Sequence, residues 1–306
     1  MNNTEKDFDM IDEDDELISN STSYEEDEAD EVFDAKEKKR KRSNLISRII
    51  LIVSACVFIF AAYNLISILL EYKKGNDIYD NIEENVIEEK PVTIVIGEDN
   101  QEVEVPFVYD HESLLEINSD GLGFLYIPSI DVRLPIAQTT DNDFYLHHTF
   151  DKTWNDNGCL FVDYRIREGL SANHIMIYGH NMNSGAMFGK LSRYKSESWY
   201  RSEGYDRFYI YTGDVIREYK VFTVYVSEPI SDTYTFNFSS IDALRDYAAR
   251  MKNKSIFDTG VDVSNTTQVV SFSTCTNNSK DRLIVSGTFV GEAKINNINQ
   301  EESTND

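Results

Sequence analysis

The sequence predicts a mainly β fold, a largely antiparallel barrel with helices on its surface, preceded by a single transmembrane helix. Three observations support this prediction. Short apolar segments rich in β-branched and aromatic residues recur along the later part of the chain, separated by turn residues. Few segments have the spacing of an amphipathic helix. One long uncharged apolar run precedes the predicted strands.

The chain begins with an acidic segment, residues 1–35, which holds 15 acidic residues and one Lys. This segment offers too little apolar surface to offset the entropy of ordering a chain, so we expect a disordered cytoplasmic tail. Residues 36–48 follow as a basic juxtamembrane segment, which contains Lys36, Lys38, Lys39, Arg40, Lys41, Arg42 and Arg48.

The apolar run, residues 49–70, contains no charged residue and has about the length of roughly 20 residues that a bilayer core requires. A soluble core helix rarely stays apolar on all faces for so long. A cleavable signal peptide would have a shorter run, closer to the N-terminus. Because basic residues favour the cytoplasmic side, we expect a single-pass cell-membrane protein with a cytoplasmic N-terminus and residues after Leu70 outside.

Beyond the membrane we expect a stalk or outer segment at residues 71–107, a folded domain at 108–292 and a polar C-terminal tail at 293–306. Two strands are predicted around Pro128, within residues 123–137. Further strands are predicted within residues 158–164, 174–179, 207–212, 218–226, 267–274 and 282–290. Apolar residues spaced by three and four predict helices at 111–118, 185–194 and 240–252.

Composition excludes several classes of function. The net charge is -25, with 54 acidic against 29 basic residues, and binding to nucleic acid requires a basic face. The three cysteines, Cys56, Cys159 and Cys275, are too few for a disulfide-stapled domain. We expect His174, which opens an apolar segment, to lie at the surface.

Cys275 stands where an apolar, β-branched strand ends and a polar turn begins, and Arg282 opens the next strand. Because the intervening turn is short, the guanidinium should lie near the sulfur. A neighbouring positive charge lowers the pKa of a cysteine and favours the reactive thiolate. An arginine also offers donors to the oxyanion that forms during acyl transfer. The plainer alternative is a solvated arginine at the rim of the domain.

His180 follows an apolar strand and a glycine, so it too is expected at a strand end, where side chains from separate segments converge. An extracellular cysteine with a separate histidine and arginine fits nucleophilic acyl transfer. Spacing alone leaves two alternatives open: chance co-occurrence, and a disulfide between Cys159 and Cys275. Cys159 lies among apolar neighbours, which favours a buried free thiol.

At these residues the sequence resembles the sortases, and more closely their class B. The family's TLxTC motif ends a strand, and residues 271–275 here read SFSTC, so that its last two positions match. The likeness covers roughly residues 110–290. The other matches are Arg282 at the start of the next strand, GHNM at 179–182, MFG at 187–189, YLHH at 145–148 and DYR at 163–165.

The resemblance implies a closed barrel of about eight strands with peripheral helices, and a sortase catalytic domain at 108–292. It implies that the Cys275 thiolate attacks a Thr carbonyl in the C-terminal sorting signal of a secreted protein, with His180 as proton donor and Arg282 at the oxyanion. A peptidoglycan amine then accepts the acyl group, which anchors the surface protein to the cell wall of a Gram-positive bacterium. Ser273, on the strand face of the nucleophile, and Thr274 are expected to contact the substrate.

We expect no cofactor, no nucleic-acid partner and no metal, because no set of His, Cys and carboxylate residues clusters in the sequence. Two rival functions remain open: an extracellular cysteine hydrolase that releases the acyl group to water, and a non-enzymatic, membrane-tethered wall-binding module. A pilin-polymerising transpeptidase fits less well, because such enzymes often carry a second span and residues after Lys294 are polar.

Overall fold

We describe the fold from a computed structural model that covers residues 13–97, 101–276 and 280–294. The chain forms two units, residues 1–67 and 68–306, and the strands lie in the second unit. The residues outside the described ranges include the start of the acidic segment and most of the polar C-terminal tail.

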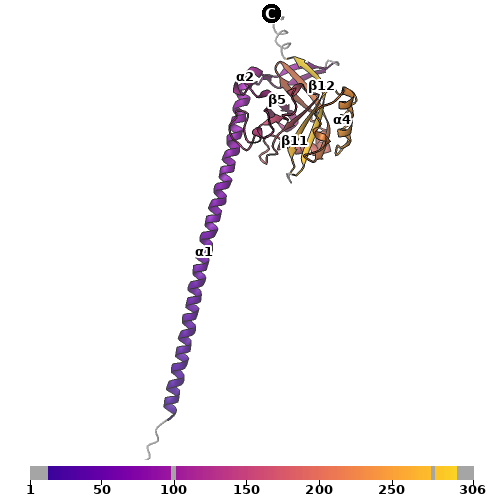
Figure 1. The fold of residues 1–306 in the computed structure, drawn as a ribbon. Coiled ribbons are helices and arrows are strands. Elements are labelled where there is room, and N and C mark those ends of the chain that lie inside the picture. The colour runs from indigo at the N-terminus through magenta and orange to yellow at the C-terminus, as the bar shows by residue number, and fades with distance from the viewer. Residues whose placement is uncertain (1–12, 98–100, 277–279, 295–306) are drawn as a thin grey trace, which may run out of the picture. The chain divides into compact units, whose positions relative to one another are not determined.

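One long helix, α1 (Glu13–Val86), contains the apolar run (Figure 1). The large apolar side chains of this run are exposed; Phe58, for example, has an exposed fraction of 73%. Among the described residues α1 is the one helix that is long and apolar enough to cross a membrane, so it is compatible with a single-pass membrane anchor. The helix begins inside the acidic segment for which the sequence predicts disorder. Extending an existing helix costs less than nucleating a new one, which allows helical structure there.

The second unit is built on a closed barrel of eight strands (Figure 1). The strands are β5 (Gly121–Ile127), β6 (Val132–Ala137), β7 (Leu160–Val162), β8 (His174–Tyr178), β9 (Arg207–Thr212), β10 (Val215–Ser227), β11 (Val269–Cys275) and β12 (Arg282–Lys294). Around the barrel their order is β10–β12–β11–β8–β7–β6–β5–β9. The predicted mainly β fold, with a closed barrel of about eight strands, is therefore confirmed.

Shorter elements surround the barrel. Two small sheets pair β1 (Ile87–Glu88) with β4 (Val108–Tyr109), and β2 (Val92–Ile96) with β3 (Gln101–Val105). The remaining helices are α2 (His111–Ile117), α3 (Glu197–Tyr200) and α4 (Ile241–Asn253). The 3-10 helices are η1 (Pro128–Ile130), η2 (Phe144–Leu146), η3 (Gly169–Ser171), η4 (Leu191–Lys195) and η5 (Asp232–Tyr234).

Two neighbouring pairs in the barrel, β6–β7 and β8–β11, are parallel, whereas the other pairs are antiparallel. Parallel strands require long crossover connections, while antiparallel strands can be joined by a tight turn. The chain meets this requirement, since the connections between the parallel partners run from 138 to 159 and from 179 to 268. The parallel pairs matter for function because they bring the carboxyl ends of two strands to the same rim.

The segment before the domain packs on the barrel. Val86, Ile94 and Phe107 are buried in the same core as the barrel residues. The rings of Phe107 and Tyr211 on β9 stack with their centroids 4.9 Å apart. Residues 75–97 and 102–107 thus contribute apolar area to the core. Burial of a large apolar side chain stabilises a fold by roughly 1.5–3 kcal/mol.

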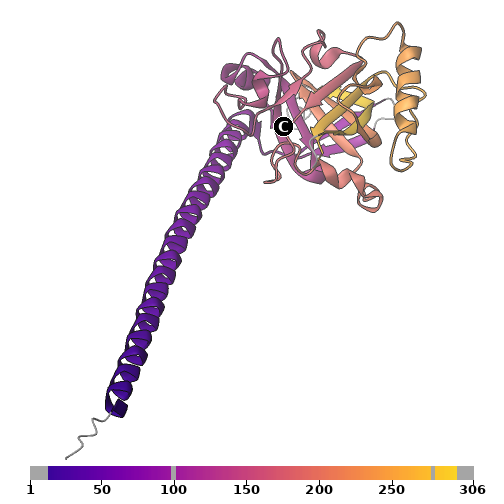
Figure 2. The same cartoon turned by 60° about the horizontal axis from the view of Figure 1, so that its bottom comes forward.

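Helix α4 forms as its spacing predicts and covers the outside of the barrel, as Figure 2 shows. The Ser240 side chain accepts a hydrogen bond from the Ala243 amide and caps the helix. The buried face of α4 packs on Phe222 and Tyr225 of β10. This face consists of Leu244, Tyr247, Ala248 and Met251.

The predicted helix at 185–194 is wrong. Residues 182–190 form turns, and a 3-10 helix, η4, begins only at Leu191. Gly185 has a φ of +86°, which is incompatible with a right-handed helix. At Gly189 a Cβ atom would lie 2.2 Å from the Met182 carbonyl oxygen, so the chain folds back tightly here. The apolar spacing reflects burial of Met187, Phe188 and Leu191 from a compact loop.

The expectation that His174 lies at the surface is also wrong, because its exposed fraction is 0%. Its Nδ1 lies 2.7 Å from the Thr235 carbonyl oxygen and its Nε2 lies 2.9 Å from the Ser271 hydroxyl. A carbonyl only accepts, so Nδ1 donates and Nε2 accepts from Ser271. This arrangement holds a neutral imidazole, and burial lowers the pKa of His174 to about 4.

The neutral His174 predicts a stability that falls on acidification. Below its ordinary pKa the unfolded chain binds a proton at His174, while the folded protein stays neutral there down to about pH 4. We expect the free energy of unfolding to fall by about 3 kcal/mol between pH 6.5 and pH 4 from this group. Urea denaturation across this range measures the slope. The His174→Gln variant should lack this contribution, and parallel curves for the two proteins would contradict it.

Candidate functional site

Three strand ends meet at one rim of the barrel. In the parallel pair β8–β11, Tyr178 lies opposite Ser273, so the chain positions two residues further on are His180 and Cys275. In the antiparallel pair β11–β12, Cys275 lies opposite Arg282. The register of the barrel therefore brings together the three residues that the sequence singles out, and all three line one hollow of about 360 Å³.

The pairing of β11 with β12 sets Cys275 directly across from Arg282. The Thr276 amide donates a hydrogen bond of 3.0 Å to the Asp281 carbonyl oxygen, which continues the ladder past Cys275. Cys275 and Arg282 are both half-buried. A thiol with this exposure is accessible to a substrate.

His180 is fixed by the loop that follows it. The Phe188 amide donates a 2.9 Å hydrogen bond to the His180 carbonyl oxygen, which closes the loop. The Phe188 ring is buried and its centroid lies 5.2 Å from that of Phe272 on β11. The loop is therefore attached to the strand that carries Cys275. Gly179 is required before the histidine, because a Cβ atom there would lie 2.5 Å from the Leu160 side chain.

A hydrogen bond to the backbone shows which ring nitrogen of His180 carries a hydrogen. Its Nε2 lies 2.7 Å from the Leu146 carbonyl oxygen, at the end of η2. Since a carbonyl oxygen only accepts, Nε2 carries a hydrogen in this contact. Nδ1 is then the nitrogen that can gain or lose a proton without breaking the bond to Leu146.

One wall of the hollow is organised by a buried carboxylate, Asp163. It accepts hydrogen bonds from Tyr178 Oη at 2.8 Å, from Asn142 Nδ2 at 3.1 Å, and from both Nε and Nη2 of Arg165. Tyr178 and Asn142 both line the hollow. Burial raises the pKa of Asp163, but the hydrogen bonds from Arg165 and Tyr178 outweigh this effect and hold the pKa below its usual value.

A second tyrosine of the hollow, Tyr234, is the last residue of η5. Its ring lies nearly parallel to that of Tyr178, with centroids 6.4 Å apart. Its hydroxyl lies 3.3 Å from Ser273 Oγ. Burial raises the pKa of Tyr234, although the nearby Arg282 opposes the shift. The hollow thus places aromatic surface and hydroxyl groups around the thiol.

The two expected substrate-contact residues also line the hollow but are almost fully buried. The exposed fractions of Ser273 and Thr274 are 1% and 3%. Within the described part of the chain, Thr274 Oγ1 is buried without a hydrogen-bond partner.

The disulfide alternative is excluded in this structure, because Cys159 and Cys275 are both free. Cys159 has an exposed fraction of 1%, and burial raises the pKa of its thiol to about 12. A protonated and inaccessible thiol is unreactive. Cys275 is the cysteine in the domain that solvent can reach.

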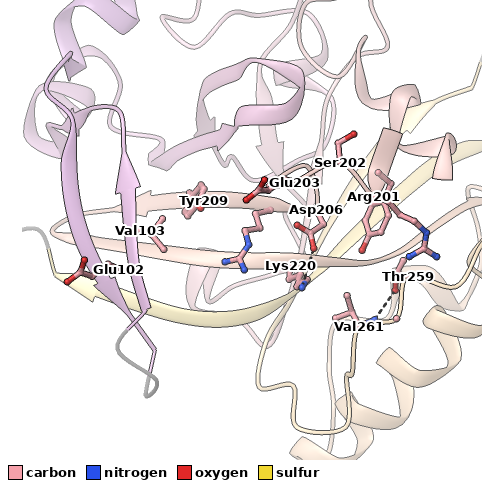
Figure 3. Close-up of a pocket in the computed structure, with 14 residues that line it drawn as sticks. Glu102, Val103, Arg201, Ser202, Glu203, Asp206, Tyr209, Lys220, Thr259 and Val261 are labelled. Atoms are coloured by element: carbon pink, nitrogen blue, oxygen red, sulfur yellow. Dashed lines mark hydrogen bonds and ion pairs between the residues drawn. The ribbon is translucent and has the colours of Figure 1, made fainter. Parts of the chain in front are cut away.

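Larger hollows occur elsewhere on the domain. Figure 3 shows one of about 740 Å³, in which charged side chains from β9, β10 and the segment after α3 face one another. Lys220 pairs with Asp206 at 3.3 Å, and Arg207 pairs with the buried Glu218. These charges neutralise one another, and neither cysteine nor histidine lies among the described residues that line this hollow. Volume alone therefore does not locate the chemistry.

Across residues 13–97, 101–276 and 280–294, no three His, Cys, Asp or Glu side chains gather as a metal site would require. We therefore assign no residue to a metal or cofactor. The chemical capacity of the hollow lies in its own thiol, imidazole and guanidinium.

Sequence reasoning missed several residues of the site. The Leu146 carbonyl has no side-chain signature, although the YLHH stretch that contains Leu146 belongs to the family resemblance. The DYR stretch belongs to it too, but the sequence gives no role to its Asp163, which organises one wall of the hollow. The available signal is the arginine two residues after Asp163. Asp163 follows an apolar strand, and a buried carboxylate requires a partner such as Arg165.

Known proteins resemble this chain over most of its length. A family model described as the sortase domain matches residues 125–290, more than half of the chain. Sortase B of Listeria monocytogenes is 28% identical over 255 residues, which cover 82% of this chain and 99% of that protein. Sortase B of Staphylococcus aureus is 24% identical over 238 residues, which cover 78% and 91%.

A solved structure of sortase B from Bacillus anthracis, in complex with AAEK1, has the same fold. Its TM-score is 0.60 at 24% identity, and the match covers 73% of this chain and 100% of that one.

The hydrogen bonds around Asp163 predict that its negative charge stabilises the folded protein. In Asp163→Asn the shape is kept, but the Arg165 guanidinium loses its charged partner and the amide presents hydrogens toward other donors. We expect the free energy of unfolding to fall by about 2 kcal/mol, as measured by urea denaturation.

The matched control is Asp242→Asn, which removes the same charge from an exposed pair with Arg245. That variant should change stability by less than about 0.5 kcal/mol. Equal effects at the two positions would contradict the role of Asp163.

Proposed function

This chain belongs to the sortase family, in its class B, and from that premise we propose that Cys275, His180 and Arg282 carry out its transpeptidation. Sortases are cysteine transpeptidases, so the chain is an enzyme that exchanges one acyl bond for another. The observation that supports the residue assignment is the register that places all three side chains around one hollow.

The first half-reaction forms a thioester. The Cys275 thiolate adds to the carbonyl carbon of a Thr in the C-terminal sorting signal of a secreted protein. The Arg282 guanidinium donates to the resulting oxyanion, whose charge a preorganised donor stabilises. The C–N bond then breaks, the departing amine takes a proton from His180, and the acyl group remains on Cys275.

The second half-reaction transfers the acyl group. An amine of the peptidoglycan precursor adds to the thioester carbonyl while His180 accepts its proton. The C–S bond breaks, an amide forms, and Cys275 returns to the thiolate. In this proposal Nε2 keeps its hydrogen bond to the Leu146 carbonyl oxygen through both steps, and Nδ1 serves as acid in the first and as base in the second.

The walls of the hollow supply substrate recognition in this proposal. Tyr178 and Tyr234 offer flat apolar surface with hydroxyl groups at the edge, which suits an extended peptide. Ser273 and Thr274 remain proposed contacts, through the small part of each side chain that reaches the surface.

We propose the same membrane orientation that the flanking charges predict. The basic cluster at 36–48 precedes the apolar run, whereas only Lys73 and Lys74 follow it closely. The amino-terminal segment is then cytoplasmic and the barrel extracellular, where sorting signals and wall precursors are found.

Transpeptidation is tested with full-length protein in detergent, sorting-signal peptides of varied sequence and a small wall-type amine, with products followed by mass spectrometry. We expect a peptide–amine adduct in the wild type and none in Cys275→Ala, because no other thiol lines the hollow. Cys159→Ala should stay active, since that thiol is buried and does not line the hollow. Cleavage without adduct for every amine would favour a hydrolase.

The oxyanion role of Arg282 is tested with Arg282→Lys, which keeps the charge but loses the planar fork of donors. We expect kcat to fall about 100-fold, in the range found for loss of an oxyanion donor. A rate within twofold of the wild type would assign that function to another group.

The non-enzymatic, wall-binding alternative would be favoured by two results together: no peptide is cut, and Cys275 is alkylated no faster than a thiol in an unfolded peptide.

The orientation is tested in protoplasts with a tag at either end of the chain. A membrane-impermeant protease should remove the C-terminal tag and leave the N-terminal tag intact until the membrane is opened. Replacing the basic residues of 36–48 by glutamine should increase the inverted fraction. Digestion of the N-terminal tag in intact protoplasts would reverse the assigned topology.

A further inference from the structure

The part of α1 that follows the apolar run packs on the loop before β7. Gly75 and Tyr79 face this loop and are both buried, with Tyr79 at an exposed fraction of 8%. Three hydrogen bonds join the two segments. Asn155 Nδ2 donates to the Glu71 carbonyl oxygen at 3.1 Å, the Asp156 amide donates to Glu71 Oε1 at 3.3 Å, and Tyr79 Oη donates to the Gly158 carbonyl oxygen at 2.5 Å.

The contact is close enough to require a glycine in the helix. A Cβ atom at Gly75 would lie 2.2 Å from Asn157 Nδ2 and 2.8 Å from Asn155 Oδ1. Glycine weakens a helix interior, so its presence in α1 is explained by the approach of the loop. Residues 155–158 are therefore seated on the helix by both shape and hydrogen bonds.

The same loop supports the carbonyl that holds the catalytic imidazole. The Cys159 amide donates to the Tyr145 carbonyl oxygen at 2.9 Å, and the Asn155 amide donates to the His147 carbonyl oxygen at 3.0 Å. Gly158 has a φ of +62°, and a Cβ atom there would lie 3.0 Å from both the Leu146 carbonyl oxygen and His180 Cδ2. The loop, η2 and the His180 ring thus form one packed layer.

We propose that Tyr79 and Gly75 are positioning residues for His180. They hold residues 155–158 against α1. These residues in turn hold the Leu146 carbonyl in place, and that carbonyl determines which imidazole nitrogen carries the hydrogen. This inference rests on the proposed role of His180 in transpeptidation.

The predicted consequence is specific to proton transfer. When the loop loosens, the Leu146 carbonyl no longer aligns with Nε2, and the imidazole can adopt the tautomer with its hydrogen on Nδ1. That tautomer cannot accept a proton at the nitrogen used for the amine substrate, so kcat falls. Neither Tyr79 nor Gly75 lines the hollow that binds the peptide, so we expect kcat to change more than KM.

The test compares Tyr79→Phe with Tyr200→Phe in full-length protein in detergent. Both changes delete one phenolic hydroxyl that donates to a backbone carbonyl, and Tyr200 donates to Val221 at 2.7 Å on a different part of the barrel. We expect kcat to fall roughly twofold to tenfold for Tyr79→Phe, the effect of one hydrogen bond. We expect Tyr200→Phe to keep the wild-type kcat. Equal kcat values for the two variants, at matched melting temperatures, would overturn the proposal.

A second readout needs no substrate. In protein labelled with ¹⁵N at histidine and held at a pH at which the His180 imidazole is neutral, the His180 resonances report which ring nitrogen carries the hydrogen. The wild type and Tyr200→Phe should show the Nε2–H form, and Tyr79→Phe should show an increased share of the Nδ1–H form. An unchanged tautomer in Tyr79→Phe would refute the positioning role even if its kcat were reduced.

The two hypotheses can fail separately. If the wild type formed no peptide–amine adduct, the proposed function would fail, while the tautomer measurement would still decide the positioning role.

Gly75→Ala adds a third comparison, with Lys74→Ala as its control on an exposed position of the same helix. We expect Gly75→Ala to lower kcat more than Tyr79→Phe does, because the added methyl displaces Asn157. Wild-type kcat in a folded Gly75→Ala protein would count against the proposal.

Discussion

The parallel pairing of β8 with β11 is the constraint on which the site depends. It aligns two strand ends that lie far apart in the sequence, so that the residues beyond Tyr178 and Ser273 become neighbours. A register slip of one residue would turn every side chain of the strand to the other face. The buried His174 reinforces the register from within, since its imidazole joins β8 to Ser271 on β11.

Around this frame, the reactive groups are held by contacts that the chemistry itself does not use. Asp163 gathers Tyr178, Asn142 and Arg165 at one wall of the hollow. The Leu146 carbonyl oxygen accepts a hydrogen bond from Nε2 of His180 and so fixes the imidazole. A catalytic side chain must be held within a fraction of an ångström of its working geometry, and such supporting contacts provide that accuracy.

Local patterns in the sequence were sufficient for the strands, for α4 and for the position of Cys275, His180 and Arg282 at strand ends. The short β11–β12 connection alone places Arg282 beside Cys275. The meeting of His180 with them depends on a parallel pair, and no local pattern specifies strand direction. The segment 185–194 imitates a helix because a compact loop also buries apolar residues at spacings of three and four. The burial of His174 depends on partners from three separate segments.

Closure of the barrel has a consequence for how a peptide is recognised. An open sheet can bind an extended chain by adding it as a further strand, with main-chain hydrogen bonds that are indifferent to sequence. In the described barrel each strand has a neighbour on both sides over at least part of its length, which leaves little unpaired edge for this mode. Selectivity must come from side chains and loops around the thiol. Such a barrel offers few unpaired strand edges to which partly unfolded chains could add indiscriminately.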